Sequence, residues 1–97
     1  MTVEVRYRPG DQYDVLIFKH EDERYSMVTC SSAAEVGTTI CRVADQVGWN
    51  ELRLPILVGG QRPRGAAALP DDLKQVLADI VLEHRRQLAR MGLAPRQ

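Results

Sequence analysis

The stretch Leu69–Met91 constrains the fold most, because it predicts one long helix with a continuous apolar stripe. One histidine and seven apolar residues recur every three or four positions along it: Leu73, Val76, Leu77, Ile80, Val81, His84, Leu88 and Met91. This spacing places them on one face of an α-helix. A stripe of this length needs a second surface to cover it, so it also raises the question of self-association.

The segment 1–30 predicts three strands joined by short turns. Thr2–Arg8 alternates apolar and polar residues, which is typical of a strand with one buried face. Tyr13–Lys19 contains four consecutive apolar residues, so it suits a strand that is covered on both faces or lies inside the sheet. Arg24–Cys30 alternates again. Because the connections are short, we expect an antiparallel meander.

A first helix is expected over residues 32–48. Ser32 and Glu35 have the spacing of a capping box, in which the hydroxyl accepts from the Glu35 amide and the carboxylate reaches back. Gly48 is a natural stop for this helix. Its expected buried stripe consists of Val36, Ile40, Val43, Ala44 and Val47.

The rest of the chain predicts a strand, a loop and the long helix. Alternation over residues 51–58 indicates a fourth strand, and Pro55, which lacks an amide hydrogen, favours a sheet edge. Residues 59–69 form the loop. The last helix spans residues 70–91, and Pro70 suits its first turn.

The order β-β-β-α-β-α in a single domain, 1–97, predicts an α+β fold. The expected architecture is a four-stranded, mostly antiparallel sheet with two helices packed on one face. The fourth strand can join at an edge or beside the first strand. About 20 helical residues span ~30 Å, whereas strands of this length span roughly 20–24 Å. The last helix therefore overhangs the sheet, and we expect Leu88 and Met91 to be exposed in a monomer.

The formal net charge is zero, which gives no reason to expect strong non-specific attraction to nucleic acid or membranes. The charge is uneven, however. Residues 1–58 carry six basic and nine acidic side chains, and residues 59–97 carry seven and four. Helix-dipole placement and chance explain such asymmetry, and it can also steer a partner or a second copy. Eleven arginines against two lysines are common in proteins of GC-rich genomes, which favours a bacterial or phage source.

Nothing in the sequence predicts a membrane location. Thr2–Arg8 alternates and carries charge, unlike a signal peptide. No apolar run approaches the ~20 residues that a membrane span requires. We therefore expect a cytoplasmic protein with no membrane partner.

Cysteine and histidine spacing predicts no metal, cofactor or catalytic residue. Ten residues separate Cys30 from Cys41, and His20 and His84 lie far away, so no zinc-site pattern forms. Two cysteines are too few for a disulfide scaffold, and buried free thiols are the simpler interpretation. Two clusters of acidic residues could be read as acid–base catalysts. Asp71 and Asp72 are better explained by the start of a helix, and residues 21–23 by a solvated turn.

The loop carries the most suggestive polar cluster. Arg62 and Arg64 follow two glycines, and guanidinium groups beside free backbone amides suit phosphate or carboxylate recognition. The loop is not a phosphate-binding P-loop, because the Gly-Lys-Ser/Thr sequence that ends such a loop is absent. The simpler interpretation is a connector made soluble by two arginines.

Three functional hypotheses follow. The first is a non-enzymatic protein-binding or regulatory module that docks onto another, unidentified protein and forms a homodimer through the C-terminal helix. Its predicted self-association residues are Leu77, Ile80, His84, Leu88 and Met91. The second is binding of nucleic acid or an anionic ligand through Arg62 and Arg64. The third is a small enzyme whose site forms between subunits, with His84 contributing to it.

Overall fold

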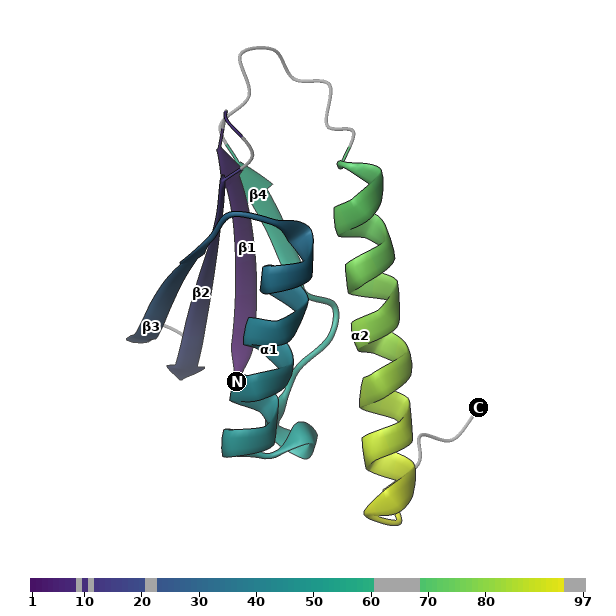
Figure 1. Ribbon diagram of the computed structural model, residues 1–97. Coiled ribbons are helices and arrows are strands. Elements are labelled where there is room, and N and C mark those ends of the chain that lie inside the picture. Colours follow the sequence, from purple (N-terminus) through teal and green to yellow (C-terminus); the bar gives the residue numbers. More distant parts are fainter. Residues whose placement is uncertain (9, 11, 21–22, 61–68, 94–97) are drawn as a thin grey trace.

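The fold agrees with the predicted class and element order. A computed structural model describes residues 1–8, 10, 12–20, 23–60 and 69–93. The chain follows β1 (Thr2–Arg8), β2 (Gln12–His20), β3 (Glu23–Cys30), α1 (Ala33–Val47), the 3-10 turn η1 (Trp49–Glu51), β4 (Leu57–Gly60) and α2 (Asp71–Arg90). Figure 1 shows the sheet on one side and the two helices on the other. The prediction of an α+β domain with a β-β-β-α-β-α order is confirmed.

The sheet is mixed, with the order β3-β2-β1-β4. β1 pairs antiparallel with β2, and β2 pairs antiparallel with β3, as a meander requires. β4 pairs with β1 in parallel, so the fourth strand lies both at an edge and beside the first strand. A parallel pair needs a crossover connection, and α1 supplies it.

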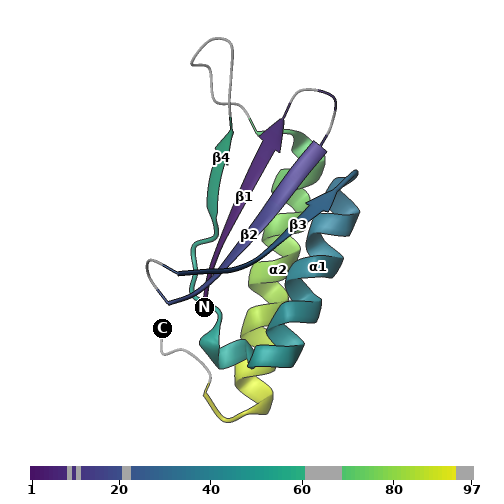
Figure 2. The same ribbon diagram turned by 90° about the vertical axis from the view of Figure 1, so that its left-hand side faces the viewer.

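The apolar run in β2 is explained by its interior position between β1 and β3. Val15 and Ile17 join the core beneath the helices. Leu16 points to the opposite face and is buried there, although it is not part of that core. Figure 2 shows both helices on one side of the sheet, so the Leu16 face carries no helix.

The fourth strand is shorter and later than the segment 51–58 predicts. Trp49–Glu51 forms a 3-10 turn, and the ladder begins only at Leu57. Leu52 is buried, and Leu54 and Ile56 pack against the core, so the alternation reports burial rather than strand pairing. Pro55 also has no amide hydrogen to donate to a ladder.

Helix α1 begins and ends where its capping residues predict. The Ser32 hydroxyl accepts from the Glu35 amide at 3.2 Å. The Glu35 carboxylate reaches back one residue further than a capping box requires, to the amide and hydroxyl of Ser31 at 3.2 and 2.8 Å. Gly48 ends the helix with a φ of 112°, and its amide donates to the Ala44 carbonyl at 2.7 Å. Such a positive φ favours glycine.

Helix α2 buries its inner face and extends past the end of the sheet. Leu73 and Ile80 belong to the core, and Leu77 packs against it. The lower end of α2 passes the strands and reaches beyond η1 (Figure 1). The expected exposure is found at Met91, which is 46% exposed, but not at Leu88, which is half-buried. No helix in the described part of the chain is long and apolar enough to cross a bilayer.

Candidate functional site

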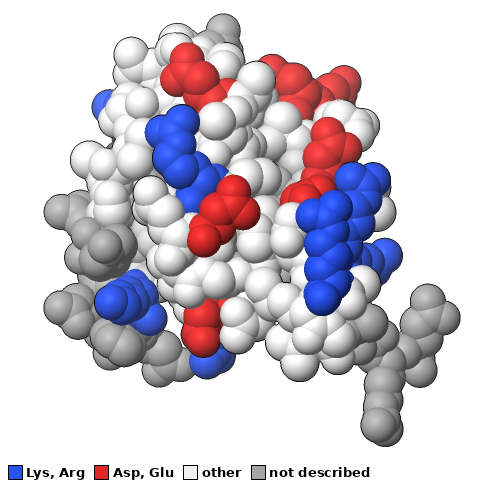
Figure 3. Space-filling view, turned by 60° about the horizontal axis from the view of Figure 1, so that its bottom comes forward, with Lys and Arg blue, Asp and Glu red and all other residues white. Residues whose placement is uncertain are grey.

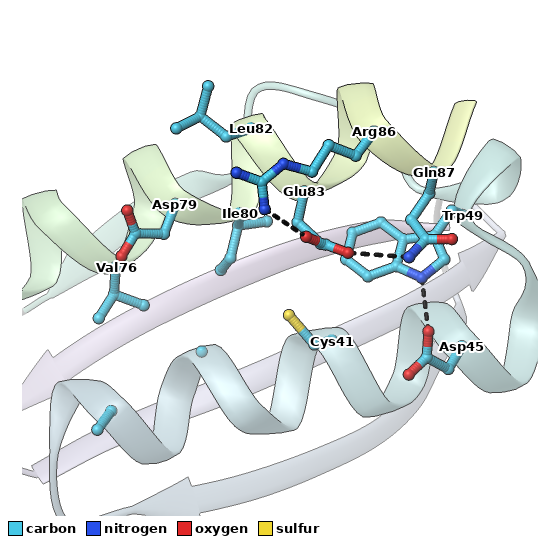
Figure 4. Close-up of a pocket in the computed structure, with 12 residues that line it drawn as sticks. Cys41, Asp45, Trp49, Val76, Asp79, Ile80, Leu82, Glu83, Arg86 and Gln87 are labelled. Atoms are coloured by element: carbon cyan, nitrogen blue, oxygen red, sulfur yellow. Dashed lines mark hydrogen bonds and ion pairs between the residues drawn. The ribbon is translucent and has the colours of Figure 1, made fainter. Parts of the chain in front are cut away.

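A groove between the two helices is a candidate site. α1 and α2 run side by side in the same direction, as both ribbon views show. The neighbouring surfaces of the two helices, together with Trp49, line an open groove of about 590 Å³ (Figure 4). Val76 and Ile80 point toward α1, whereas Leu82 points away from it. The groove therefore has an apolar interior and a half-exposed leucine at its rim.

Small residues on α1 set the spacing of the two helices. Ala34, Gly37 and Cys41 recur every three or four residues along the groove. A Cβ atom built at Gly37 would lie 2.9 Å from Cγ1 of Val76, closer than carbon atoms pack. Glycine at this position therefore allows α2 to approach α1.

Trp49 closes the groove near the lower end of α1. Its indole is buried, and its Nε1 donates to the Asp45 carboxylate at 2.6 Å. A buried indole N–H requires an acceptor, and this charge-assisted bond fixes the ring. The aromatic ring thus forms a fixed part of the groove wall (Figure 4).

The groove is lined by three carboxylates and one guanidinium, which gives it a formal charge of −2: Asp45, Asp79, Glu83 and Arg86. Glu83 accepts from Gln87 at 2.9 Å and pairs with Arg86 at 3.4 Å. Asp79 accepts from the neutral Gln75 amide at 3.0 Å. The negative charge of Asp79 is therefore not balanced by the hydrogen bond that it makes.

Cys41 has the properties of a packing residue rather than a nucleophile. Burial raises the pKa of its thiol, and the carboxylates of Glu83 and Asp45 raise it further. A raised pKa keeps the thiol protonated at neutral pH, whereas a catalytic cysteine needs the thiolate. Cys30 is buried beneath α1, with its sulfur 3.5 Å from the Thr39 hydroxyl.

Metal ligation finds no support among the residues that the structure describes, where no group of three or more His, Cys, Asp or Glu side chains is arranged to hold an ion.

The predicted self-association residues do not share one exposed surface. Ile80 is 2% exposed and Leu77 packs against the core, so both contact their own chain. His84 and Leu88 are half-buried, and Met91 is exposed. Their role in self-association stays a prediction. The other predicted site residues, Arg62 and Arg64, lie outside the described residues.

Leu82 is the site residue that the periodicity argument missed. It is 50% exposed and lies off the apolar stripe, on the outward face of α2. A single leucine among polar residues produces no periodic signal. Its spacing from Asp79 and Arg86, three and four residues, would have placed all three on one face of the helix.

The open face of the sheet is a second apolar surface. One row of paired residues crosses the four strands on this face and consists of Leu57, Glu4, Leu16 and Met27. Leu57 is 53% exposed on this face. The same face carries an exposed ion pair between Glu4 and Arg6 at 3.1 Å. This surface lies on the opposite side of the sheet from the helices (Figure 2).

Comparison with known proteins finds no matching family model, no matching curated protein and no matching solved structure.

Proposed function

We propose that this protein is a non-enzymatic docking module that forms a homodimer through α2 and acts by binding another protein. The observation that carries the proposal is the exposure of apolar side chains along this helix. Leu82 is 50% exposed, Met91 46% and Leu93 53%. Of the six large apolar side chains that are well exposed among the described residues, these three belong to α2 or directly follow it.

Concentrated apolar exposure on one element is typical of an interaction surface. Scattered surface leucines are ordinary, but here the three residues lie within the last three turns of one helix and just beyond its end. Burying one such side chain contributes on the order of 1–2 kcal/mol, so an exposed leucine on each copy supplies part of a dimer's stability. The overhang of α2 makes this end accessible to a second copy (Figure 1).

The chemistry of the groove supports docking rather than catalysis. The pKa of the Cys41 thiol is raised, so the thiol is not activated. The Asp45 carboxylate is used to hold Trp49. The groove therefore offers a fixed apolar wall with charged margins, which is the composition of a protein-binding surface.

The test is the mass of the protein in solution, measured by light scattering on a sizing column at low and moderate salt. The wild type should elute at twice the chain mass of 10.9 kDa. The variant Leu82→Glu should be a folded monomer, because each copy then places a charge at the proposed interface. Leu57→Glu is the matched control, since Leu57 is equally exposed but lies on the far face of the sheet.

Three results would contradict the proposal. A wild type that stays at 10.9 kDa at high protein concentration would rule out the homodimer. A Leu82→Glu variant that is folded by circular dichroism and still dimeric would show that the outward face of α2 is not the interface. Loss of the dimer in Leu57→Glu would move the interface to the open face of the sheet.

A further inference from the structure

The outward face of α2 carries a reversal of charge around one exposed leucine. Four residues on this face are spaced by four, three and four positions, which is the spacing of a helix–helix seam: Gln75, Asp79, Leu82 and Arg86. Asp79 and Arg86 are both exposed, on either side of the half-exposed Leu82. Figure 3 shows acidic and then basic side chains following one another down the right-hand side of the molecule, where α2 lies.

From this pattern we infer that α2 pairs antiparallel with α2 of a second copy, with the two-fold axis beside Leu82. The inference rests on the proposed homodimer and specifies its register. Asp79 lies three residues before Leu82 and Arg86 lies four after it, about 4.5 and 6 Å along the helix axis. Reversing the second helix therefore brings Asp79 of each copy beside Arg86 of the other.

The charges discriminate between the two ways of pairing the helices. A parallel pair would place Asp79 beside Asp79 and Arg86 beside Arg86, and like charges at such positions are repulsive. The antiparallel pair makes the same favourable contact twice, as a two-fold interface requires. The helix dipoles act in the same direction, because α1 and α2 run parallel within one copy and the second copy opposes both.

The interactions that these charges already make do not prevent the pairing. Arg86 pairs with Glu83 at 3.4 Å through an exposed contact, and Asp79 accepts from Gln75 at 3.0 Å, also at the surface. Exposed contacts of this kind contribute little, so both side chains are free to reorient. A second copy's Arg86 would also add positive charge to a groove of formal charge −2.

Leu82 supplies the apolar centre of the pair. Because it lies next to the axis, Leu82 of one copy packs against Leu82 of the other. Leu82 is also part of the groove rim, so this contact covers the α2 side of the groove. The groove beside α1 remains accessible in the dimer, where a partner protein can reach it.

Charge reversal tests the register. We would measure the dimer dissociation constant by sedimentation for Asp79→Arg, for Arg86→Asp, for their equimolar mixture and for the chain that carries both changes. Each single variant should dimerise at least about tenfold more weakly than the wild type, because two contacts per dimer become repulsive. The mixture should form a heterodimer, and the doubly changed chain should recover dimerisation, because both restore opposite charges at each contact.

Lys74→Glu is the matched control. It makes the same change in net charge on an exposed side chain of α2 that lies eight residues from Leu82, about 12 Å along the helix axis. It should change the dissociation constant by less than about threefold. Circular dichroism of every variant establishes that the fold is retained.

The outcomes separate this inference from the proposed function. A monomeric wild type refutes the homodimer itself. A dimer that is lost in Leu82→Glu but is unaffected by either single charge reversal keeps α2 as the interface and refutes the antiparallel register. A mixture that stays monomeric, or a Lys74→Glu variant as weak as Arg86→Asp, likewise refutes the register.

Discussion

The close approach of α1 and α2 predicts an unusual response to the substitution Gly37→Ala. In an exposed helix, alanine is favoured over glycine by about 1 kcal/mol. Here the added methyl group would lie 2.9 Å from Cγ1 of Val76, about 0.6 Å inside ordinary carbon–carbon contact. Valine is restricted to one main rotamer in a helix, so it cannot move aside freely. Overpacking of this kind costs about 1–3 kcal/mol, so Gly37→Ala should be neutral or destabilising by up to about 2 kcal/mol.

Shortening the Val76 side chain should reverse the sign of the stability change caused by Gly37→Ala. In a Val76→Ala background the methyl group has space, and Gly37→Ala should stabilise the protein by about 1 kcal/mol. The four proteins of this cycle would be unfolded in urea at one fixed protein concentration, because dimerisation adds to apparent stability. The expected coupling energy is about 1–3 kcal/mol. If Gly37→Ala stabilises both backgrounds equally, the helices do not approach each other as closely as described, and the reasoning fails.

Two further predictions concern titratable groups. The rate of Cys41 alkylation should rise with pH, and the midpoint of this rise should lie above the ordinary thiol pKa of about 8.5. The reason is that burial and nearby carboxylates raise the pKa of this thiol. Glu83→Gln should lower that midpoint, and buried Cys30 should not react in the folded protein. Hydrogen bonds from Ser31 lower the pKa of Glu35, so Glu35 stabilises the fold above the ordinary glutamate pKa of about 4.3, and this contribution is lost as the pH falls through the lowered value. The difference in thermal midpoint between the wild type and Glu35→Gln should therefore shrink below that pH; a constant difference would contradict the assignment.

Local chemistry predicted the element order well. Alternation identified β1 and β3, and the capping residues Ser32 and Gly48 fixed both ends of α1. These signals depend on neighbours in the sequence, so they are visible before the fold is known.

The fourth strand was predicted less well, because alternation reports burial and not pairing. Leu54 and Ile56 alternate with exposed residues and pack on the core, yet they do not pair in the sheet. Pairing begins at Leu57, where the backbone runs beside β1. Only the tertiary structure determines that position.

The candidate site was largely invisible in the sequence. The apolar stripe of α2 marks the face that its own core covers, so Ile80 was assigned to self-association although it is buried in the monomer. The accessible part of α2 depends on where α1 lies and on the length of the sheet. Leu82 becomes notable only once the structure shows that it points outward between Asp79 and Arg86.

Self-association of this protein is tested most directly by the mass of the wild-type chain across a range of concentrations. Sedimentation equilibrium should show a mass that rises from 10.9 kDa to twice that value as the concentration increases, with little loss at moderate salt. A mass that remains at 10.9 kDa at every concentration would contradict the account.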